Sequence, residues 1–148
     1  MKVYLDNCCF NRPYDDQSDW KIRVETEAKQ GIQDLIKAGQ ISLAWSYILD
    51  FENSKNPNPD RRSSIRTWKT IAVQYIRESA ALLEEMDRLV NLGIKPLDAL
   101  HVACAISAEC THFITTDNGI LKKSSLISGI SIVDPVDFIR GYKHEIGR

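Results

Sequence analysis

The sequence predicts an α/β protein with a mainly parallel central sheet that helices cover on both faces. Short apolar runs of strand length occur at residues 2–6, 41–45, 112–116 and 130–133, and longer segments with helical periodicity separate them. Strands that alternate with helices are typical of crossover units, in which the strands run parallel. A chain of 148 residues fits one domain. We therefore expect residues 1–148 to form a single domain without an internal repeat.

The first part of the chain contains two strands and a long helix. Residues 2–6 form the first strand, and residues 7–18, which are rich in turn formers, are expected to be a loop. Apolar side chains recur at helical spacing over residues 20–37, and Gly39 is expected to end that helix. The alternating run at 41–45 follows as the second strand.

A short helix and a long loop come next. Ser46 is expected to be the N-cap of the short helix, which carries Glu52. Residues 53–60 contain two prolines and three asparagines and are the clearest loop in the chain. Asp60 is expected to cap a further helix that extends to about Tyr75.

Helices outweigh strands in the second half of the chain. A helix at residues 79–92 is stopped by the glycine that follows it, and a helix at 96–109 begins with proline, which suits a first turn. Strands at 112–116 and 130–133 then lead to a closing helix at 135–142.

Composition excludes several classes of protein. The chain is 43% hydrophobic and 26% charged with a net charge of −1, so any contact with nucleic acid must come from local basic clusters. The four cysteines lack the spacing of a zinc site, and a chain of this size needs no disulfide, so we expect reduced thiols. No apolar run approaches the roughly 20 residues of a membrane span, and the N-terminus has no signal-peptide pattern. We therefore expect a cytoplasmic protein without a membrane partner.

Acidic residues lie at four places where an apolar run ends or a helix begins: Asp6, Glu52, Asp98 and Asp117. The carboxyl ends of parallel strands meet at one edge of a sheet, where α/β proteins bind ligands. Carboxylates gathered there repel each other, by about 4 kcal/mol for a pair ~4 Å apart. A hard divalent cation would hold them together, because Mg²⁺ and Mn²⁺ prefer carboxylate oxygens. Taken one at a time, each acid is also explained as a helix cap or a solvated turn.

The local sequence around these acids is more specific than their positions. A strand ending in Asp6 is followed by a Ser-to-Glu element at residues 46–52, by LDALHVA at 97–103 and by FITTD at 113–117. This succession, over about residues 1–140, resembles the PIN domain family. That family consists of small nucleases, many of them toxins of VapBC-type toxin–antitoxin modules.

The resemblance implies a three-layer α/β/α fold and a metal-dependent endoribonuclease. Asp6, Glu52, Asp98 and Asp117 would bind Mg²⁺ or Mn²⁺ and position the water that hydrolyses an RNA phosphodiester bond. The resemblance also implies a cognate antitoxin as partner and a homodimer. The preference for RNA over DNA rests on the resemblance alone, because hydrolysis by a metal-bound water does not use the 2′-hydroxyl.

Polar residues near the acids are expected to contact the substrate. Asn7, Arg12 and Thr116 are the candidates, with Asn7 donating to a phosphate or to a metal-bound water. A basic cluster with an aromatic residue is either a site for single-stranded RNA, a partner surface or a solvated helix face. Its members are Arg61, Arg62, Arg66, Trp68 and Lys69.

Two assignments have an alternative. Asp50 competes with Glu52, but residues two apart cannot share a helix face, and we choose Glu52, which the family prefers at this position. His101 either orients a carboxylate or is a packed histidine satisfied by backbone groups, and we favour the second interpretation.

Two other functions compete with the nuclease. A catalytically inactive PIN-like module that binds RNA or protein would be expected to have lost one of the four acids. A phosphatase of the haloacid dehalogenase type needs Asp-x-Asp after the first strand, and Asp6-Asn7-Cys8 breaks that pattern.

Overall fold

The computed structural model describes residues 1–147 and contains a five-stranded sheet in which neighbouring strands are parallel. The strand order is β3-β2-β1-β4-β5. The strands are β1 (Lys2–Leu5), β2 (Ser42–Ser46), β3 (Gln74–Ile76), β4 (His112–Ile114) and β5 (Ser131–Val133). In the centre, Tyr4 of β1 is level with Ala44 on one side and with Phe113 on the other. The predicted α/β class with a parallel sheet is confirmed.

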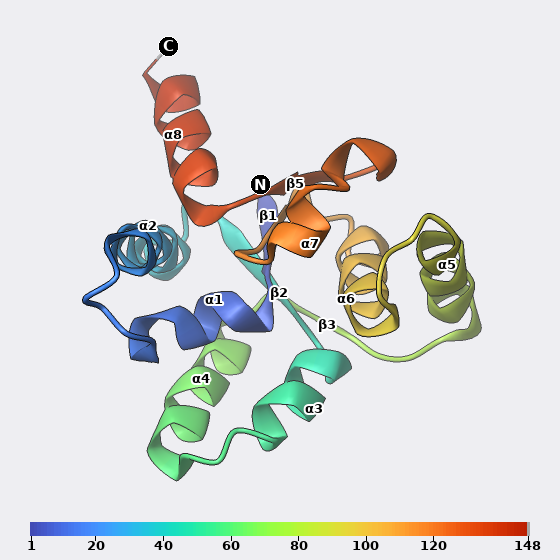
Figure 1. Ribbon diagram of the computed structural model, residues 1–148, viewed down its shortest axis with the longest axis horizontal. Helices are drawn as coiled ribbons and strands as arrows, with labels where there is room; N and C mark the ends of the chain where they lie inside the picture. The colour runs from blue at the N-terminus through green and yellow to red at the C-terminus, as the bar shows by residue number, and fades with distance from the viewer. Residues whose placement is uncertain (148) are drawn as a thin grey trace.

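Helices connect the strands and cover both faces of the sheet. Over residues 1–147 they are α1 (Asn7–Asn11), η1 (Arg12–Tyr14), α2 (Trp20–Lys37), α3 (Tyr47–Ser54), α4 (Pro59–Ile71), α5 (Ala80–Asn91), α6 (Pro96–Ser107), α7 (Asn118–Leu121), η2 (Ser124–Leu126) and α8 (Pro135–Ile146). Figure 1 shows α5 and α6 packed together on one side of the sheet and α2 and α8 on the other. The fold therefore has three layers. Within residues 1–147, no helix combines the length and apolar character needed to cross a membrane.

The core is built around the central strand. Val3, Tyr4 and Leu5 are completely buried, as expected for a parallel strand covered on both faces. Small buried residues of α6, such as Ala99 and Ala103, allow this helix to lie close to the sheet. All four cysteines are free thiols, as their spacing predicted.

Several local signals act as predicted. Gly39 and Gly93 follow α2 and α5 with φ angles of +75° and +96°, a conformation that glycine adopts without strain. Ser46 caps α3, because its Oγ accepts a hydrogen bond from the Leu49 N–H at 3.2 Å.

The prediction of a loop over residues 7–18 is wrong for residues 7–14, which are helical. Asp6 directly follows β1 and is the N-cap of α1, with its carboxylate accepting a hydrogen bond from the Asn7 N–H at 2.8 Å. The chain therefore turns directly from strand into helix, and η1 continues that turn.

The helix predicted to reach Tyr75 ends at Ile71, and Tyr75 lies instead in the edge strand β3. The predicted cap is also wrong, because Asp60 lies inside the first turn of α4. Asn58 is the N-cap, and its side chain accepts from the N–H groups of Asp60 and Arg61.

Two serine caps differ in a way that tests the core. Ser46 and Ser79 each cap a helix, but the Ser46 hydroxyl is also bonded to the buried Tyr4 hydroxyl at 2.6 Å. Ser79→Ala should lower the free energy of unfolding by about 1 kcal/mol. Ser46→Ala should lower it by about 2–3 kcal/mol, because a buried hydroxyl also loses a partner. Urea denaturation measures both, and equal losses would contradict the role of the Tyr4 contact.

Candidate active site

The four predicted acids meet in one pocket of about 310 Å³ at the carboxyl edge of the sheet. The residues that line it are Asp6, Asn7, Cys8, Asn11, Asp15, Glu52, Leu97, Asp98 and Asp117. The strand order places β1 and β4 side by side, while the chain continues from them toward opposite edges of the sheet. The pocket therefore lies at the topological switch point, where doubly wound α/β folds bind their ligands.

Asp6 is buried beside the pocket, and hydrogen bonds hold its carboxylate in place. Its side chain is only 6% exposed and accepts hydrogen bonds from the Asn7 N–H and from Thr115 Oγ1, each at 2.8 Å. The Thr115 hydroxyl also accepts from the Asp117 N–H at 3.0 Å, and its bond to Asp6 ties the end of β4 to the end of β1. Burial raises the pKa of Asp6 above its ordinary value, although the nearby His101 and the Thr115 hydrogen bond oppose this.

Two side chains hold the carboxylate of Glu52 in place by hydrogen bonds. Asn7 Nδ2 donates to one carboxylate oxygen at 3.2 Å, and His101 Nε2 is hydrogen-bonded to the other. The other ring nitrogen of His101 is bonded to the Tyr4 hydroxyl at 2.6 Å, and the His101 side chain is 1% exposed. His101 is packed, but the interpretation that backbone groups satisfy it is wrong. It orients a carboxylate, that of Glu52.

Asp98 and Asp117 come from two different helix starts. Asp98 is the third residue of α6 and is half-buried, and burial together with the charges of Asp117 and Asp6 raises its pKa to about 6. Asp117 is the N-cap of α7 and accepts from the Gly119 N–H at 2.7 Å. A Cβ atom at position 119 would lie 3.0 Å from the Asp117 carboxylate, so glycine is the residue that allows this close approach.

Asp50 has a structural role instead. Its carboxylate accepts from Trp45 Nε1 at 2.9 Å, from Tyr75 Oη at 2.6 Å and from Lys69 Nζ at 3.0 Å. It does not line the acidic pocket, whereas Glu52 does. The choice between the two acids therefore agrees with the structure.

The structure places one of the three predicted substrate contacts in the acidic pocket and two outside it. Asn7 lines the pocket, but Arg12 and Thr116 do not. Arg12 instead pairs with Asp15 at 3.1 Å and with Glu25 at 3.5 Å. Contacts of Arg12 and Thr116 with a substrate stay predictions.

The basic cluster lies outside the acidic pocket. Arg62, Arg66 and Lys69 line a separate hollow of about 410 Å³ beside α3. Two of these cations are already engaged, Lys69 by Asp50 and Arg62 by the carbonyl oxygen of Asn56. The cluster therefore joins α3 to α4 as well as carrying charge.

Cys8, Asn11 and Asp15 also line the pocket and were not predicted to do so, because the helix that places Cys8 and Asn11 beside Asn7 was not expected. The spacing of Asn7 and Asn11, four residues apart, was the available signal, since such residues share one face of a helix. The thiol of Cys8 lies 3.5 Å from both the Asp6 carboxylate and the Thr115 hydroxyl.

The chemistry of the donor set suits a hard divalent cation. Five carboxylates line the pocket, those of the four predicted acids and of Asp15, and Asn7 Oδ1 is a buried acceptor that has no hydrogen-bond partner among residues 1–147. In their present conformations, no three His, Cys, Asp or Glu side chains of the described chain are close enough to hold one ion. Glu52 and Asp117 are each engaged by hydrogen bonds within the protein in this arrangement.

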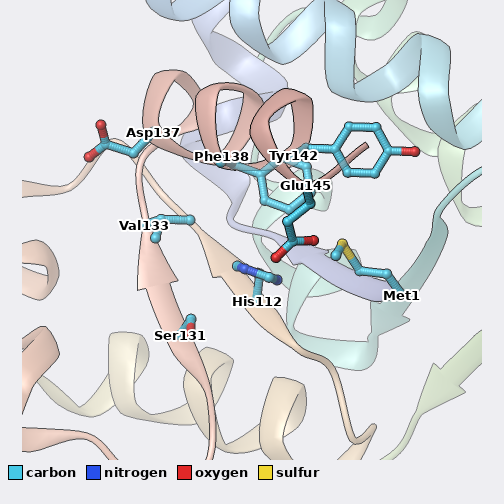
Figure 2. Close-up of a pocket in the computed structure, with 9 residues that line it drawn as sticks. Met1, His112, Ser131, Val133, Asp137, Phe138, Tyr142 and Glu145 are labelled. Atoms are coloured by element: carbon cyan, nitrogen blue, oxygen red, sulfur yellow. The ribbon is translucent and has the colours of Figure 1, made fainter. Parts of the chain in front are cut away.

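A third hollow, of about 180 Å³, lies at the opposite edge of the sheet (Figure 2). His112 and Ser131 are the first residues of β4 and β5, so this hollow lies at the amino ends of the strands. His112 packs edge-on against Phe138, with 5.0 Å between ring centres, and burial lowers its pKa. This hollow is therefore remote from Asp6, Glu52, Asp98 and Asp117.

The pH dependence of the free energy of unfolding can test whether Asp50, rather than Glu52, stabilises the fold. Burial alone would raise the pKa of Asp50, but its hydrogen bonds from Tyr75, Trp45 and Lys69 outweigh this and lower the pKa below 3.8. The stability that Asp50 supplies is therefore present above its ordinary pKa and is lost as the pH falls through the lower pKa of the folded state.

Asp50→Asn should lower the free energy of unfolding at neutral pH by about 1–3 kcal/mol. It should also make the loss of stability between about pH 5 and pH 3 shallower. Glu52→Gln retains Asp50 and should keep the steeper loss. Urea denaturation across this pH range checks both variants, and parallel curves for Asp50→Asn and the wild type would refute the assignment.

The comparisons with known proteins are structural. The sequence matches no protein-family model and no curated protein. A chain of the crystal structure of VapBC2 from Rickettsia felis, bound to a DNA fragment from their promoter, is similar with a TM-score of 0.55 and 17% identity, over 89% of this chain and 97% of that one. A chain of DNA-bound VapBC from Salmonella typhimurium is similar with a TM-score of 0.54 and 17% identity, over 91% and 98%. At this identity the likeness concerns the fold, and it agrees with the motifs: the chain has the PIN-like α/β/α fold.

Proposed function

We propose that this protein is a metal-dependent endoribonuclease that uses Mg²⁺ or Mn²⁺. The observation that carries the proposal is the convergence of Asp6, Glu52, Asp98 and Asp117, from four separate segments, on one pocket at the switch point. No lysine or arginine is among the described residues that line it. Carboxylates in such a site gain no stability from each other, so their convergence is best explained by a cation that they bind together.

Different side chains of the protein would have different roles in the proposed site. The four carboxylates would hold the cation, which would lower the pKa of a bound water and polarise the phosphoryl oxygen. Asp6 is fixed by Thr115, and Glu52 is fixed by Asn7 and His101. Asn7 Oδ1 and the exposed faces of Asp98 and Asp117 would orient water and substrate. No nucleophilic side chain is required for this reaction.

We further propose that the protein is the toxin of a toxin–antitoxin pair and acts as a homodimer. The motifs of the PIN domain family and the likeness of the fold to chains of two VapBC complexes support the toxin–antitoxin pair, and the homodimer rests on the family resemblance alone. An antitoxin would be expected to bind the folded chain and to block the acidic pocket.

Asp98→Asn is the best test of the nuclease. Asp98 makes no side-chain hydrogen bond among residues 1–147 that its removal would break, and its charge is repelled by Asp117 and Asp6. The variant should therefore fold at least as stably as the wild type while its cleavage rate falls by more than about 100-fold, beyond the 10–100-fold typical of outer-shell residues. Purified proteins are incubated with a pool of structured RNAs and Mn²⁺, Mg²⁺ or EDTA.

Asp87→Asn, which changes an exposed acid on α5, is the matched control and should cut like the wild type. Cleavage by Asp98→Asn at the wild-type rate would show that the site is assigned wrongly. If the wild type neither cuts RNA nor binds Mn²⁺ in calorimetry, the protein is a binding module rather than an enzyme.

Expression in a bacterial host tests the toxin proposal separately. The wild type should slow growth, because uncontrolled RNA cleavage depletes essential transcripts, and Asp98→Asn at equal protein level should not. Colony counts after induction measure the effect. Equal growth inhibition by both proteins would mean that toxicity does not come from the acidic pocket.

A further inference from the structure

A further polar cavity, of about 190 Å³, lies between η1, α2 and α4. We call it the α2–α4 cavity. It is distinct from the acidic pocket, although α1 borders both: Asn7 and Asn11 line the acidic pocket, and Phe10 lines the α2–α4 cavity. The other residues used below that line it are Tyr14, Lys29, Gln33 and Trp68. It contains no acidic lining residue within the described chain.

Two hydrogen-bond donors in this cavity have no protein partner among residues 1–147. The Lys29 residue is only 5% exposed, and its ammonium, which is not fully cut off from solvent, forms no hydrogen bond or salt bridge with the described residues. Gln33 is 8% exposed, and its Nε2 is buried without an acceptor. The two are four residues apart on α2, so their side chains share one face of the helix. A buried donor such as Gln33 Nε2 is normally satisfied, so its lack of a partner beside the unpaired Lys29 ammonium marks a place for an acceptor.

The protein does not supply that acceptor from α2 itself. Glu25, one turn before Lys29, is paired with Arg12 at 3.5 Å. Among the described residues, Lys29 lies near the ring of Phe10, whose centre is 5.9 Å from the ammonium nitrogen, and near the thiol of Cys9. Burial accordingly lowers the pKa of Lys29 to about 8. Keeping an unpaired ammonium here costs free energy that an anion would offset.

Two further cations, which do not themselves line the cavity, lie over aromatic rings that do. The Arg61 guanidinium lies over the Tyr14 ring at 4.6 Å, and the Lys37 ammonium lies over the Trp68 ring at 5.2 Å. Neither cation pairs with a carboxylate among residues 1–147, and Arg61 Nε is itself buried without a partner. Three cations backed by aromatic rings, with no acid between them, attract an anion.

We propose that the α2–α4 cavity is a binding site for a carboxylate. Lys29 Nζ would donate to one carboxylate oxygen and Gln33 Nε2 to the other, while Phe10, Tyr14 and Trp68 would enclose a short carbon stem. Two donors match the two oxygens of a carboxylate. A phosphodiester bears a sugar on each side and fits a small cavity with donors at its base less well. This site is independent of the activity proposed for the acidic pocket.

Propionate is the first probe, with sodium chloride at the same ionic strength as reference. Propionate should raise the Tm of the wild type and shift the Lys29 side-chain signal in NMR spectra, because it binds the folded state alone. Lys29→Met should be at least as stable as the wild type in chloride, since no unpaired ammonium is then buried. The propionate affinity of this variant should fall at least 10-fold. Lys21→Met, at an exposed position of the same helix, should respond to propionate like the wild type.

The outcomes separate the sources of the carboxylate. Capped tripeptides with a central glutamate or glutamine form a second arm. Tighter binding of the glutamate peptide than of propionate would identify a side chain of a partner protein, and the reverse order would identify a small organic acid. The proposal is overturned if the wild type does not respond to carboxylates up to about 100 mM, a weak limit for any specific site. Equal responses of wild type and Lys29→Met, or equal binding of inorganic phosphate, would also overturn it.

Discussion

The hydroxyl of Tyr4 is the constraint on which the rest of the structure depends. Tyr4 lies in the central strand, completely buried and stacked on Phe113, so its hydroxyl has no access to water. A buried hydroxyl without partners would cost about 1–3 kcal/mol. It is satisfied by Ser46, at the end of the neighbouring strand, and by His101, inside α6. One buried polar group therefore fixes the helix cap of α3 and the position of α6.

The same hydrogen bonds reach the acidic pocket. Ser46 starts the helix that carries Glu52, and His101 holds the carboxylate of Glu52 from below. Asp6 follows Tyr4 in the chain by two residues and is tied to the end of β4 through Thr115. The core thus positions two of the four acids rigidly, whereas Asp98 and Asp117 are placed by helix starts at the rim. The charges of these acids repel each other, and this repulsion lowers the stability of the folded protein.

Much of this could be predicted from the sequence, where the signal was local. Helix ends marked by Gly39 and Gly93, the Ser46 cap and the preference for Glu52 over Asp50 all depend on residues a few positions apart. Apolar runs located four of the strands, and parallel pairing then determined that the acids at their ends meet.

The errors arose where the stabilising partner is distant in sequence. β3 has three residues and exists because it pairs with β2, about thirty positions earlier, so a helical pattern hid it. α1 has five residues, too few for a period to be visible, and its cap is the acid that had been assigned to the site. The partners of His101 lie 97 and 49 positions away, beyond any local rule.

The order of the strands has a consequence for how the chain could be divided. The exposed connection between α3 and α4 separates a first piece, which carries β1, β2, Asp6 and Glu52, from a second, which carries β3, β4, β5, Asp98 and Asp117. In the sheet, the two strands of the first piece lie between those of the second. Neither piece alone could bury its strands or complete the acidic pocket. A chain cut at this connection, where exposed backbone tolerates a break, would regain its site only by reassociation, which makes the fold a natural scaffold for fragment complementation.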